Sequence, residues 1–353
     1  MAVIPVSTDA AARGDLSPSV ATRLGAVKDF SAGSGDRSTI PPPMETIARG
    51  ITYTDLLHAG RARIIATAVL QSAGGVALVD PGPSSCLDTL RASLADAGIG
   101  IGDIRKLLLT HIHLDHAGAA GSLLRENPDI EVCVHERGAP HMIDPSKLLA
   151  SAARLYGDAM DELWGPFLPV PADRVRVLAG GERIAAADRE LEVAYTPGHA
   201  SHHVSFFDRS SGVAFVGDVA GVRTGRELFV LPPTPPPDID VETWADSIEL
   251  VRRWRPSTLL VTHYGAHEDP DAHLDAMRTH LAKMTEIART VVEAGGSDAA
   301  QAGRFTESMR GYMERHLPAA EADLYGSAAP LDQCWLGLAR YWRKRGVTAP
   351  ATA

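Results

Sequence analysis

The sequence has few cysteines and no long apolar run. Only Cys86, Cys133 and Cys334 occur among 353 residues, an odd number at spacings that fit neither a disulfide framework nor a cysteine zinc site. No stretch reaches the roughly 18 uninterrupted apolar residues that would span a bilayer. Met1 to Ala12 lack the basic segment and apolar core of an export signal. We therefore expect a protein of the reducing cytoplasm without a membrane partner.

An excess of positive charge is also missing. The formal net charge is -10, and the basic residues are scattered apart from Arg340 and the cluster Arg343-Lys344-Arg345. Nucleic-acid binding requires a basic surface that neutralises phosphates. The charge balance therefore favours a small-molecule substrate over a nucleic acid.

Composition and periodicity divide the chain into three parts. Residues 1–44 are rich in Ala, Ser, Gly and Asp and have no sustained period, which predicts a mobile arm. Residues 45–269 alternate short β-branched runs with turn signals, which predicts an α/β domain. Residues 270–353 have a helical pattern, in three segments at Asp271–Ala294, Ala299–His316 and Ala319–Lys344.

The middle part contains the predicted strands and an insertion. Strands are predicted at Ile64–Leu70, Val76–Val79, Lys106–Thr110, Ile130–Val134, Val175–Leu178, Leu191–Tyr195, Val204–Phe207, Val213–Val216 and Thr258–Val261. Helices are predicted at Ser84–Ala97 and Val241–Trp254, and a helical insertion at about 140–171 includes Ser146–Trp164. The Met and aromatic stripe of this insertion fits either core, a dimer contact or the wall of a substrate pocket.

The string His111-Ile112-His113-Leu114-Asp115-His116 stands out at the end of a predicted strand. In extended backbone His111 and His113 point the same way, and Asp115 and His116 follow at the turn into a helix. Chance produces such a string in roughly one chain in a thousand of this length.

Three more candidate ligands follow later apolar runs: His199, Asp218 and His263. Imidazole and carboxylate suit zinc, and also iron or manganese, whereas the absence of cysteine argues against a closed structural zinc site. Seven such groups are enough for two metal ions.

In order and type these residues resemble the metallo-β-lactamase-fold metallo-hydrolases, in their glyoxalase II and lactonase-like branch. The likeness covers about Ile51 to Glu268 and includes Asp80-Pro81-Gly82. It implies a four-layer αββα sandwich with the site at one edge of two packed sheets, and two divalent metal ions, with Zn²⁺ the first choice. It also implies a set of ligands: His111, His113 and His199 for one metal, Asp115, His116 and His263 for the other, Asp218 between them, and Asp80 supporting a ligand imidazole.

Such a site favours hydrolysis by a metal-bridging hydroxide that attacks an ester, thioester or lactone carbonyl. No Gly-x-Ser-x-Gly motif supplies an alternative nucleophile. Asp115 and Asp218 are therefore predicted to be catalytic, and Tyr264 is a candidate hydrogen-bond donor to the oxyanion. Two neighbours of a ligand, His202 and His203, fit either substrate contact or packing. The remaining histidines, among them His58, His267, His273, His280 and His316, are interpreted as ordinary surface or helix residues.

Other functions stay open at this point. A mononuclear iron enzyme that oxidises persulfides and a phosphodiesterase share the same fold, and a metal-binding protein without turnover is the least favoured alternative. The C-terminal helices, with Trp335, Tyr341 and Trp342, fit either a cover for the sheet or a homodimer contact.

Overall fold

The computed structural model describes residues 42–349. The predicted arm at 1–44 lies almost entirely outside the described residues, and the first strand, β1, begins at Glu45. None of the helices within the described part is both long and apolar enough to cross a bilayer.

Two mixed β-sheets form the centre of the fold. The first has the order β1-β2-β3-β4-β5-β6-β7 and the second β13-β12-β11-β10-β9-β8. The strands of the first sheet are β1 (Glu45–Ala48), β2 (Ile51–Asp55), β3 (Ala66–Ser72), β4 (Gly75–Val79), β5 (Ile104–Leu108), β6 (Glu131–His135) and β7 (Val175–Leu178). Those of the second are β8 (Arg183–Ala186), β9 (Arg189–Tyr195), β10 (Val204–Asp208), β11 (Val213–Phe215), β12 (Thr258–Val261) and β13 (Gly265–His267).

The pairing of the strands brings the candidate ligands to one edge. Strands β4, β5, β6 and β7 run parallel, and β11 runs parallel to β12, while the other neighbours are antiparallel. The carboxyl ends of parallel strands meet at the same edge of a sheet, which is where α/β proteins place their ligands. The loops after β4, β5, β11 and β12 therefore converge.

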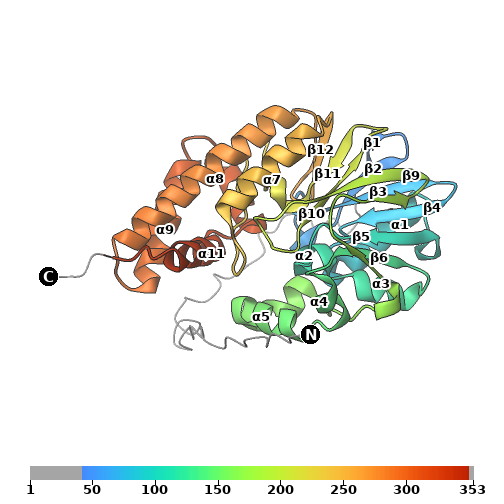
Figure 1. Ribbon diagram of the computed structural model, residues 1–353, viewed down its shortest axis with the longest axis horizontal. Helices are drawn as coiled ribbons and strands as arrows, with labels where there is room; N and C mark the ends of the chain where they lie inside the picture. The colour runs from blue at the N-terminus through green and yellow to red at the C-terminus, as the bar shows by residue number, and fades with distance from the viewer. Residues whose placement is uncertain (1–41, 350–353) are drawn as a thin grey trace, which may run out of the picture. The chain divides into compact units, whose positions relative to one another are not determined.

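Helices cover the outer face of each sheet (Figure 1). Helices α1 (Leu87–Asp96), α2 (Leu114–Ala117) and α3 (Ala120–Glu126) pack on the first sheet, and α7 (Val241–Arg253) and α8 (Pro270–Glu293) on the second. A third apolar cluster, which includes Leu108 and Phe206, fills the space between the sheets. The layers are thus the αββα sandwich that was predicted.

The insertion lies between β6 and β7, but it is not one helix from 146 to 164. It consists of α4 (Ala139–Ile143), α5 (Ser146–Tyr156) and α6 (Met160–Trp164). The break falls at Gly157, whose φ of 52° is accessible to glycine but interrupts a right-handed helix.

The C-terminal region contains one helix more than the pattern predicted. Helices α9 (Asp298–Met313), α10 (Ala319–Ala328) and α11 (Leu331–Lys344) follow α8, and Pro330 separates the last two because it cannot continue a helix. Trp335 is 2% exposed and lies in the core cluster shared with α7 and α8. Within this chain α9 and α11 pack on α8 and on each other, so they extend the helical layer that begins with α7 and α8.

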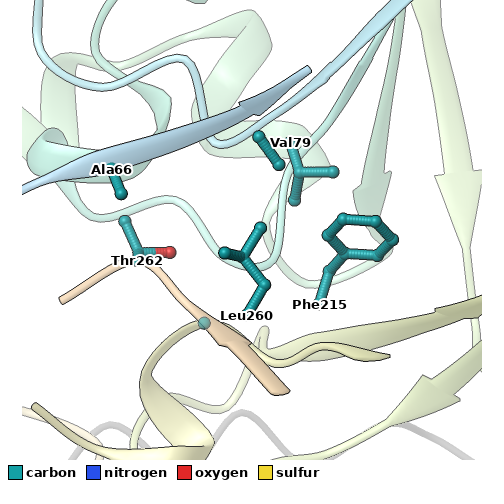
Figure 2. A pocket seen from close by; sticks show the side chains of 7 residues that line it. Ala66, Val79, Phe215, Leu260 and Thr262 are labelled. Atoms are coloured by element: carbon teal, nitrogen blue, oxygen red, sulfur yellow. The ribbon is translucent and has the colours of Figure 1, made fainter. Parts of the chain in front are cut away.

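A small cavity lies between the sheets directly beneath the predicted site (Figure 2). Its lining is apolar apart from Thr262, whose hydroxyl already donates to Asp80 at 2.9 Å. Its members come from both sheets: Ala66, Ala68, Val79, Phe215, Gly217, Leu260 and Thr262. This cavity belongs to the core between the sheets.

The close approach of α11 to the proline-rich loop yields a stability prediction. A Cβ added at Gly337 would overlap the carbonyl oxygen of Thr234, so we expect Gly337→Ala to lower the free energy of unfolding by about 1–3 kcal/mol. Gly303 in α9 is the matched control, because nothing lies within 4 Å of its added Cβ. Gly303→Ala should stabilise the protein by up to about 1 kcal/mol. Denaturant unfolding curves of equal midpoint for the two variants would contradict the packing argument.

Candidate metal centre

The histidine-rich string lies where β5 turns into a short helix. The chain remains non-helical from Leu109 to His113, and α2 then begins at Leu114, so that Asp115 and His116 sit in its first turn. The extended backbone brings Nε2 of His111 within 2.9 Å of Nδ1 of His113. Both rings therefore point the same way, as the alternation of side chains predicts.

The other three predicted ligands come from the second sheet. His199 follows β9, Asp218 lies in the 3₁₀ turn Gly217–Ala220 after β11, and His263 directly follows β12. All three are at most 3% exposed. The structure thus brings all seven predicted ligands together at the edge shared by both sheets.

A first group consists of three imidazoles. Nε2 of His199 lies 3.0 Å from Nδ1 of His113, which is also close to Nε2 of His111. Burial, together with the charges of neighbouring histidines, holds the pKa of His111 well below its usual value and lowers that of His113 to about 4. Neutral rings whose nitrogen lone pairs converge form a binding site for a cation.

A second group consists of Asp115, His116 and His263. Nε2 of His263 lies 3.2 Å from Oδ2 of Asp115, and Nε2 of His116 lies 3.8 Å from the same oxygen. Burial lowers the pKa of His116, but the carboxylates of Asp218, Asp115 and Asp80 outweigh it and raise the pKa well above its usual value. This group therefore attracts positive charge.

Asp218 lies between the two groups and faces both. Its Oδ2 is 3.3 Å from Nε2 of His199, while its Oδ1 is 3.3 Å from Nε2 of His116 and 3.6 Å from Nε2 of His263. Burial opposes its ionisation, but the surrounding imidazoles hold its pKa well below the usual range. One carboxylate oxygen is thus directed at each group.

The far nitrogens of the ligand rings are fixed by acceptors. Nδ1 of His116 donates to Oδ2 of Asp80 at 2.8 Å, Nδ1 of His199 to the carbonyl of Pro233 at 2.8 Å, and Nδ1 of His263 to the carbonyl of Ile64 at 2.6 Å. Such bonds leave Nε2 as the free lone pair and orient each ring.

Among the residues that accept hydrogen bonds from the ligand rings, Asp80 has the most hydrogen-bond partners. Besides His116, it accepts bonds from the Thr110 amide at 2.8 Å, the Thr110 hydroxyl at 2.7 Å and the Thr262 hydroxyl at 2.9 Å. The Thr110 oxygen in turn lies 3.1 Å from Nδ1 of His111. Asp80 is thereby linked to two ligand rings, one directly and one through Thr110.

The residues present fit a divalent metal. Nε2 of His116 and Oδ1 of Asp218 are buried but have no hydrogen-bond partner among the described residues. Orphaned buried polar atoms are costly in a folded protein. Three overlapping sets of these side chains have donor atoms within 4.8 Å of one another. All donors are imidazole nitrogen or carboxylate oxygen, the set that zinc, iron and manganese accept.

A further group, formed by His267, Asp269 and His273, meets the same distance criterion. It already contains a cation, since Nη1 of Arg223 lies 2.7 Å from Oδ1 of Asp269 and 3.4 Å from Nδ1 of His273. We therefore treat it as an ion-paired cluster separate from the metal centre.

Tyr264 was predicted to donate a hydrogen bond to an oxyanion, but its side chain lies in the core between the sheets. Its buried ring belongs to the core between the sheets, where it meets Tyr53 edge-on at 6.0 Å and lies beneath the guanidinium of Arg63 at 4.4 Å. Its hydroxyl is bonded to the carboxyl of Asp55. Because these contacts occupy the side chain, the structure does not support Tyr264 as an oxyanion donor.

The sequence left open whether His203 contacts substrate or packs in the core. In the structure its ring supports the backbone of Asp218. Its fully buried ring accepts a bond from the Asp218 amide at Nε2, 3.2 Å away. Nδ1 must then carry the proton, and it lies 2.9 Å from the hydroxyl of Thr196. His203 thus holds the backbone of Asp218. His202 is half-buried and its Nδ1 accepts a bond from the Ile112 amide at 3.4 Å, with its ring edge-on to His113.

His58, which was interpreted as an ordinary residue, is 6% exposed and lies near the metal centre. The charges of Asp115 and His263 both act on its imidazole. No local signal marks it in the sequence, because the fold brings it here from the loop between β2 and β3.

Comparison with known proteins identifies the class. The family model of the metallo-beta-lactamase superfamily matches residues 60–263, more than half of the chain. The chain belongs to this superfamily, which is one of metallo-hydrolases.

Individual relatives are distant. A metallo-beta-lactamase fold-containing protein of Sulfurisphaera tokodaii is 28% identical over 45% of this chain and 60% of its own length. A hydroxyacylglutathione hydrolase of Synechocystis is 28% identical over 40% of this chain and 42% of its own. The chain thus spans about half the length of the curated relatives it matches.

A solved structure shows the same fold over more of the chain. A metallo-beta-lactamase family protein from Thermus thermophilus superimposes with a TM-score of 0.60 at 21% identity, covering 80% of this chain and 89% of that one. At this identity the likeness extends to the fold alone.

The hydrogen bonds of Asp80 yield a second prediction. Asp80→Asn replaces one acceptor oxygen with an amide N–H that faces the donors of Thr110, Thr262 and His116. We expect a loss of about 1–3 kcal/mol in the unfolding free energy of the metal-free protein and about 10- to 100-fold weaker Zn²⁺ binding. Chelator competition measures the affinity. Asp88→Asn is the control, since that side chain is 98% exposed; unchanged Zn²⁺ affinity in Asp80→Asn would refute the supporting role.

Proposed function

We propose that this protein is a hydrolase with two divalent metal ions, with Zn²⁺ as the first choice, that cleaves an ester, thioester or lactone. The observation that carries this proposal is the placement of Asp218, whose two oxygens face different groups of imidazoles. A carboxylate in that position suits two cations rather than one. A mononuclear iron enzyme needs only one of the two groups.

When bound, two such ions supply a water-derived nucleophile near neutral pH and polarise a carbonyl oxygen. The residues of this chain define where that chemistry takes place. His116 and Asp218 are nearly inaccessible, with side chains 0% and 4% exposed, whereas the Asp115 side chain is 20% exposed. Of these three side chains, Asp115 is therefore the one that can meet a substrate and accept or orient a proton at its carboxylate; His113 is the other half-buried candidate ligand.

The core between the sheets lies next to the site, since the cavity lined by Ala66, Val79 and Phe215 also includes Gly217 and Thr262, which precede Asp218 and His263. Charge developing on a substrate oxygen is then stabilised in surroundings of low polarity. The name of the Synechocystis relative describes hydrolysis of a hydroxyacylglutathione, which places thioesters first in a substrate search.

The proposal is tested by measuring metal content and activity together. Purified protein is analysed for zinc, iron and manganese and assayed with esters, thioesters, lactones, phosphodiesters and persulfides. Two metal ions per chain with turnover of an acyl substrate are the expected result. One iron per chain with persulfide oxidation, or turnover of phosphodiesters alone, would overturn it.

Loss of the shared carboxylate gives a sharper prediction. Asp218→Ala removes an oxygen from each group of ligands, so we expect less than two metal ions per chain and a fall of more than about 100-fold in kcat/KM, beyond the range typical of supporting residues. Asp246→Ala, an exposed carboxylate on α7, should change neither quantity. Full activity and full metal content in Asp218→Ala would be incompatible with the shared role.

A further inference from the structure

His58 lies on a loop that is attached directly to the metal centre. It begins the 3₁₀ turn His58–Gly60 between β2 and β3. Ile64, later in the same loop, accepts the bond from Nδ1 of His263. The His58 imidazole also experiences the charges of Asp115 and His263. The loop therefore borders the Asp115–His263 side of the centre.

Two other segments hold the His58 ring. Sγ of Cys86 lies 3.6 Å from its Nδ1, and the indole of Trp164 stacks on its face at 5.2 Å with an interplanar angle of 12°. Trp164 is itself fixed, because the hydroxyl of Ser85 donates to the carbonyl of Leu163 at 2.7 Å. The ring thus has a defined orientation before any ligand arrives.

The protonation states of the Cys86 thiol and the His58 imidazole determine which ring nitrogen of His58 carries the proton. Burial raises the pKa of the Cys86 thiol to about 11 and lowers the pKa of His58 to about 4. Both groups are then neutral at pH 7. In the arrangement in which the Cys86 thiol donates to Nδ1, the ring proton of His58 is on Nε2. The contact with Cys86 then leaves this N–H available to an acceptor.

The surroundings of His58 are aromatic and contain a second unused donor. Nε1 of Trp164 is buried without an acceptor in the described part of the chain. Tyr156 meets the Trp164 ring edge-on at 5.0 Å and donates from its hydroxyl to Gln333 at 3.3 Å. The charge of Asp115 also acts on Tyr156. This side of the centre therefore presents N–H donors within an apolar wall.

We propose that His58 is a substrate-binding residue: its Nε2–H donates a hydrogen bond to an oxygen of the acyl substrate at the Asp115–His263 side, with Trp164 as the apolar wall. The proposal rests on the proposed hydrolase function for the class of substrate. It favours substrates that have an oxygen acceptor next to an apolar group, since an N–H donor is useful only to an acceptor and the wall only to an apolar surface.

Two substitutions at the same position test the donor. His58→Phe keeps a flat ring for Trp164 but removes the N–H, and we expect about a 10-fold or larger fall in kcat/KM for the best acyl substrate. His58→Gln places an amide N–H near the position of Nε2 and should recover most of that loss. Metal content and unfolding midpoint are measured for both variants. Equal losses in the two variants, or no loss in His58→Phe, would overturn the proposal.

A second measurement does not depend on activity. In metal-free protein with ¹⁵N-labelled histidine, the His58 signals are assigned by their absence in His58→Phe, and their shifts report the tautomer. We expect the neutral Nε2–H form in the wild type and in Cys86→Ser, which keeps a donor to Nδ1. An imidazolium or an Nδ1–H form at pH 7 in the wild type would overturn the proposal.

Binding of a simple carboxylate distinguishes a failure of the His58 contact from a failure of the proposed hydrolase function. Acetate, as a product analogue, is titrated by NMR into the Zn²⁺-loaded wild type and His58→Phe. Weaker binding to the variant supports the His58 contact even if no acyl substrate is turned over, and that lack of turnover contradicts only the hydrolase function. Equal acetate affinities overturn the His58 contact whatever the activity.

Discussion

The buried carboxylate of Asp80 is the constraint on which the site and the sandwich both depend. It comes from the end of β4, accepts from the backbone and hydroxyl of Thr110 after β5, and accepts from Thr262 after β12 in the other sheet. A buried carboxylate is tolerated only when its lone pairs are occupied, and each lost bond costs about 1–3 kcal/mol. Of these bonds, the one from Thr262 crosses from one sheet to the other, while those from Thr110 and His116 tie Asp80 to the turn after β5. The same carboxylate therefore links the two sheets and orients His116, a candidate metal ligand.

The candidate ligand cluster is only partly satisfied by its own contacts. Nδ1 of His113 lies 2.9 Å from Nε2 of His111 and 3.0 Å from Nε2 of His199. Nothing within residues 42–349 satisfies Oδ1 of Asp218. Such a cluster is held in place by the sheets and outer hydrogen bonds rather than by its own contacts. A cation that binds there would satisfy the orphaned atoms, and its binding free energy would add to the stability of the fold.

Sequence patterns predicted the fold where burial is continuous. The strand Thr258–Val261, buried throughout, has the predicted bounds because its apolar run ends at turn residues. Strands β1, β2, β8 and β13 escaped prediction. Three of them, β1, β8 and β13, are edge strands of three or four residues that carry no clear period. The break at Gly157 was missed because the apolar stripe continues across it. The missed strands are defined by hydrogen bonding to neighbouring strands, which the residue pattern of one segment cannot show.

Residue patterns are also limited to local information at the site, where the candidate ligands can be predicted but the residues around them cannot. The ligand string and the strand ends are local features, so the positions of His111, His113 and His199 could be predicted from short segments. Tyr264 is adjacent to a ligand in sequence, yet its hydroxyl is bonded to Asp55 inside the core. His58 lies far from every ligand in sequence, yet the loop that carries it is bonded to His263. Short segments therefore predict which candidate ligands the fold brings together, but not which other residues lie beside them.

The wall near Asp115 combines parts of the chain that are remote in sequence. Tyr156 and Trp164 come from the insertion, and Gln333, which accepts from Tyr156, comes from α11. The metal ligands, by contrast, all lie at strand ends and in the turns that follow them. Since the two sets share no backbone segment, the insertion and the C-terminal helices can change the shape of the wall without moving a ligand. If the proposed function holds, the strand ends would define the chemistry and the segments outside them the substrate preference.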